Sequence, residues 1–258
     1  MDEWDPKQYL KFRNERTRPS IDLVSRIAMD NPESIIDIGC GPGNSTRILR
    51  SKWPNSEIVG VDNSAEMISR AKKDFPGGRW IFADASRLEE NPTYNIIFSN
   101  AALQWIPNHK QLMQKLLRLV KPEGALAVQL PANNRSALHT SLMAVAQEAK
   151  WKEYVTGCES LLTYHEAEFY YNVLIPFSGV IDMWETTYYH VLGSHVDMIE
   201  WYKSTGMKPF LQRLPCDAYR GEFEKEILEK CRKMYPIQKN GDVLYPFSRL
   251  FFIAYRKA

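Results

Sequence analysis

The 258-residue sequence has no long apolar run, no closely spaced pair of cysteines and no pattern of a secretory signal in its first ten residues. A membrane-spanning helix needs about 20 consecutive apolar residues, and no run approaches that length, so no membrane partner is expected. The cysteines are scattered without a CxxC motif: Cys40, Cys158, Cys216 and Cys231. We therefore expect a cytoplasmic protein with free thiols.

An excess of either charge is also lacking. The chain has 33 basic and 31 acidic residues, for a net charge of +2. This balance disfavours a nucleic-acid partner, because nucleic-acid-binding domains carry a strong basic field. A non-enzymatic cofactor sensor, or an RNA-binding module using basic residues near the N-terminus, remains a disfavoured alternative: Lys7, Lys11, Arg13, Arg16 and Arg18.

The first half of the chain alternates short β-branched or aromatic runs with helical patterns. Strands are predicted over 34–39, 57–62, 79–84, 94–100 and 124–130, with helices near 44–52, 64–75 and 108–120. The last of these helices is expected to end at Lys121, because Pro122 disfavours helical geometry just before it. The alternation predicts a doubly wound parallel sheet.

The second half adds helical patterns over 136–149, 164–174 and 217–234, and two further strands over 180–192 and 249–255. The prediction is one Rossmann-like α/β domain over 1–258, with a mostly parallel seven-stranded sheet and a helical insert at about 193–236 before the last strand. Within it we expect an N-terminal helical lid over 1–30, a cofactor-binding core over 31–135, and the rest of the sheet with the insert over 136–258.

The stretch DIGCGPGNS, residues 37–45, places three glycines directly after the first strand. In a doubly wound sheet this turn is a usual wall of the ligand site, and glycines let a ligand approach the backbone. A phosphate-binding P-loop would need Gly-Lys-Ser/Thr at its end, which is lacking. A dinucleotide loop needs GxGxxG, and Asn44 stands where the third glycine is expected. The NAD match is therefore imperfect.

Asp37 to Gly43 resembles the D/E-x-G-x-G-x-G motif of class I methyltransferases, which use S-adenosylmethionine. The resemblance implies that Asp37 faces the methionine amino group and that the backbone from Gly39 to Gly41 lies against the methionyl and ribose parts. Asp62, at the end of the second strand, is placed to accept hydrogen bonds from the ribose hydroxyls. An NAD site would use a carboxylate at the same position.

The resemblance also implies that Asp84 and Ala85, after the third strand, lie beside the adenine amine. This second acid favours S-adenosylmethionine over the cofactor of a nicotinamide-dependent oxidoreductase. Either aspartate could instead only cap a helix, and Asn63 with Glu66 resembles a capping box. The stretch FSNAALQW, 98–105, departs from the N/D-P-P-Y/F motif of many nitrogen-directed methyltransferases, which favours a small-molecule acceptor. We also expect Asn44, Asn63, Asn100 and Trp105 in the cofactor site.

The chain as a whole resembles the bacterial trans-aconitate 2-methyltransferases. The matching stretches include WDPKQYLKFRNERTRP at 4–19, SNAALQWIPNH at 99–109, TTYYH at 186–190, TGMKPFLQ at 205–212 and RLFFIA at 249–254. The resemblance implies methylation of one carboxylate of trans-aconitate, or of a close polycarboxylate, to a monomethyl ester with S-adenosylhomocysteine as the other product. Transfer to another small molecule is the alternative.

An acceptor carboxylate is already anionic at neutral pH, so no general base is expected. Its charges call for cations, because guanidinium groups bind carboxylates in bidentate fashion. The candidate acceptor residues are Tyr9, Arg16, Arg18, Tyr188, His190 and Arg249. His190 and His195 are five residues apart, which suits neither a strand face nor a helix face, so no metal is expected.

Overall fold

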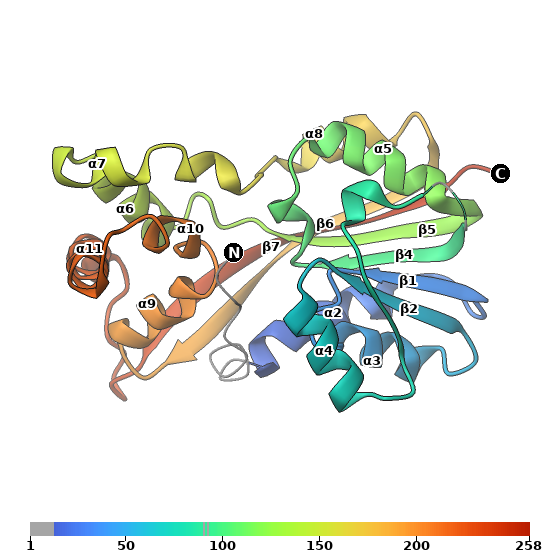
Figure 1. The fold of residues 1–258 in the computed structure, drawn as a ribbon, viewed down its shortest axis with the longest axis horizontal. Helices are drawn as coiled ribbons and strands as arrows, with labels where there is room; N and C mark the ends of the chain where they lie inside the picture. Colours follow the sequence, from blue (N-terminus) through green and yellow to red (C-terminus); the bar gives the residue numbers. More distant parts are fainter. Residues whose placement is uncertain (1–12, 90, 92) are drawn as a thin grey trace. The chain divides into compact units, whose positions relative to one another are not determined.

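Figure 1 shows the computed structural model of the protein, which describes residues 13–89, 91 and 93–258. The chain divides into two compact units. Unit 1 consists of Met1–Leu130, His165–Glu185 and Leu250–Ala258, and unit 2 of Pro131–Tyr164 and Thr186–Arg249. Each unit thus combines segments that are distant in the sequence.

Seven strands form one sheet in the order β3-β2-β1-β4-β5-β7-β6. Their bounds are β1 Ser34–Ile38, β2 Glu57–Asp62, β3 Arg79–Phe82, β4 Tyr94–Asn100, β5 Val120–Pro131, β6 Ser178–Leu192 and β7 Val243–Arg256. Parallel pairing joins β1 to β2 and β4, β2 to β3, and β4 to β5. The predicted seven-stranded, mostly parallel α/β sheet is confirmed, and the last strand of the chain lies between β5 and β6.

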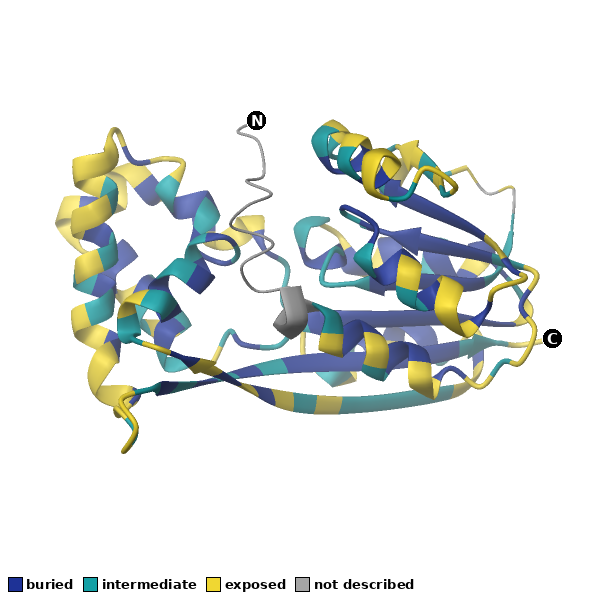
Figure 2. Ribbon diagram, turned by 90° about the horizontal axis from the view of Figure 1, so that it is seen from below, coloured by how far each residue is buried: buried dark blue, intermediate teal, exposed yellow. Residues whose placement is uncertain are grey.

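The helices of unit 1 pack on its strands and on one another. They are α2 Arg13–Arg26, α3 Asn44–Lys52, α4 Ala65–Asp74, α5 His109–Leu119 and α8 Ala167–Leu174, with short 3-10 turns η1 Ala85–Arg87 and η2 Leu103–Trp105. In α5 the apolar residues recur at helical spacing and are buried, as at Leu112, Leu116 and Leu119. Helix α2 packs against α3, and α5 against α8. Figure 2 shows the central strands as buried and the outer helix sides as exposed.

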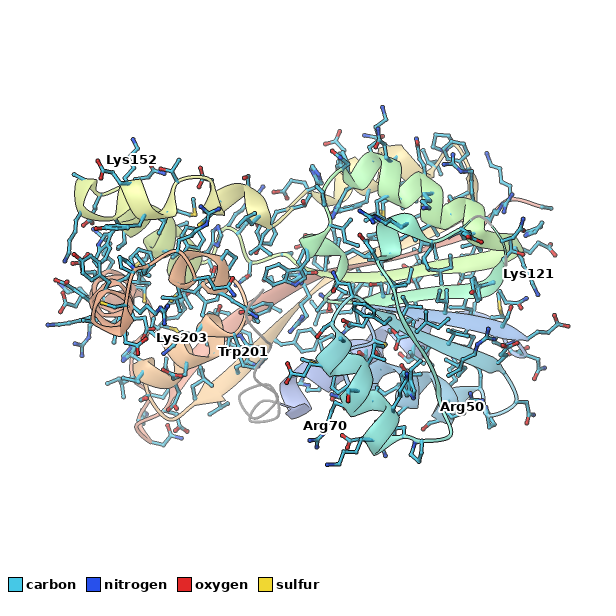
Figure 3. The ribbon with its side chains drawn as sticks, in the orientation of Figure 1. Arg50, Arg70, Lys121, Lys152, Trp201 and Lys203 are labelled. Atoms are coloured by element: carbon cyan, nitrogen blue, oxygen red, sulfur yellow. The ribbon has the colours of Figure 1, made fainter. Side chains whose placement is uncertain are left out.

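Unit 2 is mainly helical and has an aromatic core. Its helices are α6 Ala137–Ala146, α7 Ala149–Val155, α9 His195–Lys203, α10 Lys208–Leu211 and α11 Asp217–Cys231, with turns η3 Cys158–Leu161 and η4 Arg232–Met234. Helix α6 packs against α11. Trp201 of α9, labelled in Figure 3, is 1% exposed, and Phe223 of α11 is fully buried. The strands β6 and β7 each contribute residues to both units.

Two element boundaries differ from the sequence-based prediction because proline sits inside a strand. Helix α5 ends at Leu119, two residues before the expected end at Lys121, and β5 begins at Val120 instead of 124. The register then shifts between the pairs Tyr94↔Val120 and Ile96↔Ala125, so that a bulge takes up Pro122, which has no N–H for the ladder.

Strand β7 begins at Val243, not at 249, and includes Pro246. A proline within a run argues against a strand, which is why the sequence pattern missed the first half of β7. The structure also contains α7, which the sequence analysis did not predict. Within the described part of the chain, no helix combines the length and the apolar composition that a bilayer crossing requires.

Candidate functional site

The loop after β1 turns through three glycines in the left-handed region. The φ angles of Gly39, Gly41 and Gly43 are 71°, 54° and 89°. The backbone N–H groups of Gly39 and Cys40 both donate to the carbonyl oxygen of Val61, at 2.8 and 3.1 Å, so the loop is fixed to the end of β2. Residues other than glycine rarely adopt such φ angles, which explains the glycine at each of the three positions.

The three glycines meet different surroundings. A Cβ atom at Gly39 would lie 2.0 Å from the Cβ of Ala102, and one at Gly43 would lie 2.6 Å from the ring of Trp80. A Cβ atom at Gly41 would meet no described atom within 4 Å. Gly39 and Gly43 therefore allow close packing within the protein, whereas Gly41 presents bare backbone to open space, as a ligand-facing position requires.

Asp37 is buried at the end of β1 with a partly unmet carboxylate. Its Oδ2 accepts hydrogen bonds from the hydroxyls of Ser45 and Thr46, both at 2.6 Å. Its Oδ1 is buried and has no hydrogen-bond partner in the described part of the chain. Burial raises the pKa of Asp37 to about 6, against the two hydroxyl hydrogen bonds, which lower it. A cation that reached Oδ1 would favour the ionised form and lower this pKa again.

Asp62 connects the end of β2 to the glycine loop. Its Oδ2 accepts from the N–H of Gly41 at 2.9 Å, and its Oδ1 accepts from the N–H of Ser64 at 2.8 Å. Burial raises the pKa of Asp62 despite these two bonds. Its charge also raises the pKa of Asp37, which shows that the two carboxylates lie near one another. The structure thus brings Asp37, Gly41 and Asp62 together.

Helix capping near these acids differs in part from expectation. Ser64 is the N-cap of α4, and its hydroxyl accepts from the N–H of Met67 at 3.3 Å. The expected capping pair of Asn63 and Glu66 is therefore wrong, because the helix begins one residue later. Asn63 is exposed between β2 and α4, and Asn44 is half-buried at the first position of α3.

Asp84 caps the turn η1 from an exposed position. Its Oδ1 accepts from the N–H and the hydroxyl of Ser86, both at 2.8 Å, and its Oδ2 lies 3.8 Å from Nε of Arg87. The hydroxyl of Ser86 contributes most to lowering the pKa of Asp84. The strand β3 ends two residues earlier, at Phe82, whereas Ala85 is buried. No hydrogen bond between described residues links the Asp84 carboxylate to the glycine loop.

The last residue of β4 and the turn η2 that follows it each carry one unmet polar atom. Oδ1 of Asn100 and Oε1 of Gln104 are buried and accept no hydrogen bond from the described residues. Ala101 has a φ of 53°, and its N–H donates to Gln129 of β5 at 3.0 Å. Half-buried Trp105 closes the turn η2 through its N–H to the carbonyl of Ala102. Gln104 was not among the residues predicted from the sequence, although it lies within the stretch FSNAALQW, 98–105.

A buried histidine holds this segment in place. The Nε2 of His109 lies 2.9 Å from the carbonyl oxygen of Leu103, and its Nδ1 lies 2.6 Å from the hydroxyl of Tyr170 on α8. Burial lowers the pKa of His109, so the ring is neutral at pH 7. A neutral ring that donates from Nε2–H to the carbonyl accepts the Tyr170 hydroxyl hydrogen at Nδ1. Sequence reasoning missed this residue, because no local pattern marks the pair.

Three of the predicted acceptor residues meet inside unit 2. Tyr188 and His190 alternate on β6 and are 3% and 2% exposed, whereas the intervening Tyr189 is 60% exposed. Arg249 of β7 is 4% exposed, and its Cζ lies 4.6 Å from the ring centre of Phe247 and 5.9 Å from that of Tyr188. The ring of His190 lies 5.9 Å from that of Phe247. These residues form one buried aromatic and cationic group.

The remaining acceptor candidates belong to the N-terminal segment. Arg18 is exposed on α2. Arg16 lies within α2, but its side chain is outside the described structure, and Tyr9 lies outside the described residues. Of the expected lid over 1–30, the structure describes α2, Arg13–Arg26, and the segment that follows it.

Residues 9–168 match a family described as a methyltransferase domain. Curated relatives cover the whole chain: trans-aconitate 2-methyltransferases of Escherichia coli, including strains K12 / DH10B and 55989 / EAEC, are 38% identical over 256 residues, or 99% of this chain and 99% of theirs. The chain belongs to the trans-aconitate 2-methyltransferase family. This membership sets aside the oxidoreductase alternative.

Solved structures with low sequence identity share the methyltransferase fold. A Bacillus halodurans C-125 protein described as a methyltransferase has a TM-score of 0.60 at 12% identity, covering 93% of this chain and 100% of its own. A phosphoethanolamine N-methyltransferase of Haemonchus contortus, in complex with S-adenosylhomocysteine, has a TM-score of 0.58 at 18% identity, covering 93% of this chain and 53% of its own. The Rossmann-like class is therefore confirmed.

The residues of this methyltransferase suit a ligand that combines a cation with polar oxygens and nitrogens. The orphaned Oδ1 of Asp37 suits an ammonium group, and the open space at Gly41 leaves its backbone accessible. Among the described residues, no group of three His, Cys, Asp or Glu side chains is arranged to hold a metal ion.

Proposed function

We propose that this methyltransferase uses S-adenosylmethionine to esterify one carboxylate of trans-aconitate, or of a close small polycarboxylate. The similarity to trans-aconitate 2-methyltransferases over 99% of the chain carries this proposal. When bound, S-adenosylmethionine supplies a methyl group on a sulfonium, so the products are a monomethyl ester and S-adenosylhomocysteine. The proposal places the reaction in the cytoplasm, with a small-molecule partner and no nucleic acid or membrane.

The cofactor would be held mainly by the ends of β1 and β2. Asp37 receives the ammonium group at Oδ1, because Oδ2 is already occupied by two hydroxyls. Asp62 receives the ribose hydroxyls, since a carboxylate offers about four acceptor sites and the protein uses two of them. Further proposed contacts come from Gly39, Gly41, Asn44, Asn63, Asp84, Ala85, Asn100 and Trp105.

No side chain needs to remove a proton from the acceptor. An unperturbed carboxyl group titrates at about pH 4, so the acceptor oxygen is already nucleophilic at neutral pH. The protein contributes orientation, for which effective molarities of about 10⁵ M or more are known. His109 does not act on the acceptor in this proposal; it fixes the segment after β4 through the carbonyl of Leu103.

The acceptor carboxylates would bind to Arg249 with Tyr188 and His190. A guanidinium and a carboxylate 4 Å apart attract one another by about 4 kcal/mol at an effective dielectric constant of 20. The buried position of Arg249 favours a strong interaction, because screening by water is weak there. Arg16, Arg18 and Tyr9 complete the proposed set from the N-terminal segment.

Purified protein incubated with isotope-labelled S-adenosylmethionine and a panel of trans-aconitate, cis-aconitate, citrate and isocitrate tests the proposal. Mass spectrometry should identify a labelled monomethyl ester of trans-aconitate. Asp62→Ala should weaken cofactor binding at least tenfold by calorimetry. The matched control is Asp74→Ala, because the Asp74 carboxylate pairs with Arg70 on α4 at 2.6 Å. Absence of an ester from every acceptor would contradict the proposal, as would a smaller loss for Asp62→Ala.

A further inference from the structure

Unit 2 contains four tyrosines whose side chains approach one another, here called the phenol cluster: Tyr164, Tyr202, Tyr235 and Tyr245. The last three are 2%, 5% and 0% exposed. The rings of Tyr235 and Tyr245 are 5.8 Å apart. His139 joins the other two, because its Nδ1 lies 2.7 Å from the Tyr202 hydroxyl and its ring lies 5.8 Å from that of Tyr164. The cluster thus gathers hydroxyls from four separate segments.

All four phenols are protonated at neutral pH. Burial raises the pKa of each, and a negative charge on Tyr164, Tyr235 or Tyr245 would raise the pKa of Tyr202 further. Burial also lowers the pKa of His139, which is therefore neutral. The cluster is therefore a set of neutral O–H groups. The Tyr202 hydroxyl is shared with Nδ1 of His139 and donates to an anion when that nitrogen carries the imidazole proton.

Asn133, directly after β5, is a buried amide with an unmet oxygen. It is 7% exposed, and its Nδ2 donates to the Tyr245 hydroxyl oxygen at 3.1 Å. Its Oδ1 is buried without a hydrogen-bond partner in the described part of the chain. In this orientation the hydroxyl hydrogen of Tyr245 is available to an acceptor. If the amide is rotated by 180°, the available donor is Nδ2. Such an unmet group is costly unless a polar ligand reaches it.

A fixed positive charge adjoins these donors. Tyr245, Phe247 and Arg249 alternate along β7 and are all buried, so their side chains lie on one face of the strand. The Cζ atom of Arg249 lies 4.6 Å from the ring centre of Phe247, and the rings of Phe247 and Tyr245 are 5.9 Å apart, so the guanidinium lies close to this phenol. Burial raises the pKa of Tyr245, and the charge of Arg249 opposes that effect. His190 lies near the same group, with its ring 6.1 Å from that of Tyr245.

We infer that the phenol cluster, with Asn133 and Arg249, binds the non-reacting carboxylates of the acceptor and so selects a polycarboxylate over a monocarboxylate. The inference rests on the proposed function, because it concerns the same acceptor. One cation alone cannot match several carboxylates, and additional buried cations would be costly without the acceptor. Neutral phenols avoid that cost, since they donate to an anion yet remain uncharged in its absence.

Tyr245→Phe tests the inference by removing one donor from the cluster. KM for trans-aconitate should rise about tenfold or more, as expected for a lost hydrogen bond to a charged group. The kcat/KM for the monocarboxylate crotonate and the Kd for S-adenosylmethionine should stay within about twofold. The control is Tyr189→Phe, at an exposed position of β6, which should leave all three quantities unchanged. A parallel loss for both acceptors, or no loss for trans-aconitate, would overturn the inference.

A second variant covers the case in which Tyr245→Phe destabilises unit 2 by leaving the Asn133 amide unmet. The double variant Asn133→Leu with Tyr245→Phe removes both partners, which is less costly than removing one. Calorimetric titration with trans-aconitate should show at least a tenfold weaker Kd for the double variant than for the wild type. Equal affinities would overturn the inference.

The outcomes separate the inference from the proposed function. If the wild type forms no trans-aconitate ester but binds the compound, and the variants bind it less tightly, the proposed reaction fails and the binding role stands. If the wild type forms the ester and the variants keep the same preference for trans-aconitate over crotonate, the inference alone fails. If the wild type neither binds nor esterifies trans-aconitate, both are overturned.

Discussion

Asp37 should couple cofactor binding to pH near neutrality. Its pKa is raised to about 6 by burial, and its unmatched Oδ1 is the proposed receptor for the cofactor ammonium group. The ionised carboxylate binds the ammonium, so protonation of Asp37 competes with binding. With a pKa of about 6, the Kd for S-adenosylmethionine should be about tenfold higher at pH 5 than at pH 7.5. Asp37→Asn should weaken binding about 10- to 100-fold at pH 7.5 and remove most of this dependence.

Isothermal titration calorimetry at constant ionic strength, from pH 5 to 7.5, measures the dependence directly. Buffers with different ionisation enthalpies report the proton released when the cofactor binds near pH 6. Asp74→Asn, at a surface ion pair on α4, is the matched control and should follow the wild-type curve. A wild-type Kd that stays constant over this range would refute the assignment of Asp37, as would an equal pH slope in Asp37→Asn.

The same carboxylate should destabilise the cofactor-free fold as pH rises. The pKa of Asp37 is higher in the folded state than the ordinary value of 3.8, so its contribution to stability is fully present below about pH 4 and is lost as pH rises through about 6. The whole effect is on the order of 3 kcal/mol, of which about 1.4 kcal/mol is lost between pH 5 and 7.5. In urea unfolding, the free energy of unfolding of Asp37→Asn relative to that of the wild type should therefore rise by about 1.4 kcal/mol from pH 5 to pH 7.5. A constant difference would contradict the burial argument.

Substitutions in the glycine loop distinguish packing from ligand contact, and substitutions at His109 and Tyr170 measure the coupling of a buried pair. Gly39→Ala should lower the melting temperature strongly, because its Cβ atom would collide with Ala102, whereas Gly41→Ala should cost about 1 kcal/mol of backbone strain and mainly weaken cofactor binding. Thermal unfolding and cofactor titration of both variants check this, and equal effects would contradict it. His109→Leu should lower the free energy of unfolding by about 2–4 kcal/mol, and adding Tyr170→Phe should cost less than it does in the wild type. Urea unfolding of the full mutant cycle measures the coupling, and simple additivity would refute it.

The cofactor side of the molecule could be predicted largely from local sequence. The strands β2 and β4 and the helix α3 have the predicted bounds, because each apolar run or amphipathic stretch is bordered by turn residues. The acid at the end of β2 and the glycine at position 41 lie together because parallel strands end at the same edge. The pattern did not show why each position requires glycine. At Gly39 and Gly43 a Cβ atom would collide with Ala102 and Trp80, which belong to distant segments of the chain.

The partners of Asp37 were also beyond sequence reasoning, although they follow it closely. Ser45 and Thr46 lie in the first turn of α3, where hydroxyls commonly cap backbone groups, so composition alone does not predict that they bond to a carboxylate. The raised pKa of Asp37 depends on complete burial, which is a property of the packed fold and not of the motif.

The acceptor side depends on tertiary structure to a greater degree. The stretch TTYYH does not indicate which tyrosine faces inward; the strand alternation of β6 buries Tyr188 with His190 and exposes Tyr189. The phenol cluster draws its hydroxyls from residues 164–245, through helices and a proline-containing strand that local patterns could not align. A glycine loop with two acids can serve many methyl acceptors, because it recognises only the cofactor. If the phenol cluster binds the carboxylates, substitutions in it will change which acceptor is methylated, while the affinity for the cofactor stays constant. Acceptor specificity is then determined by residues of unit 2.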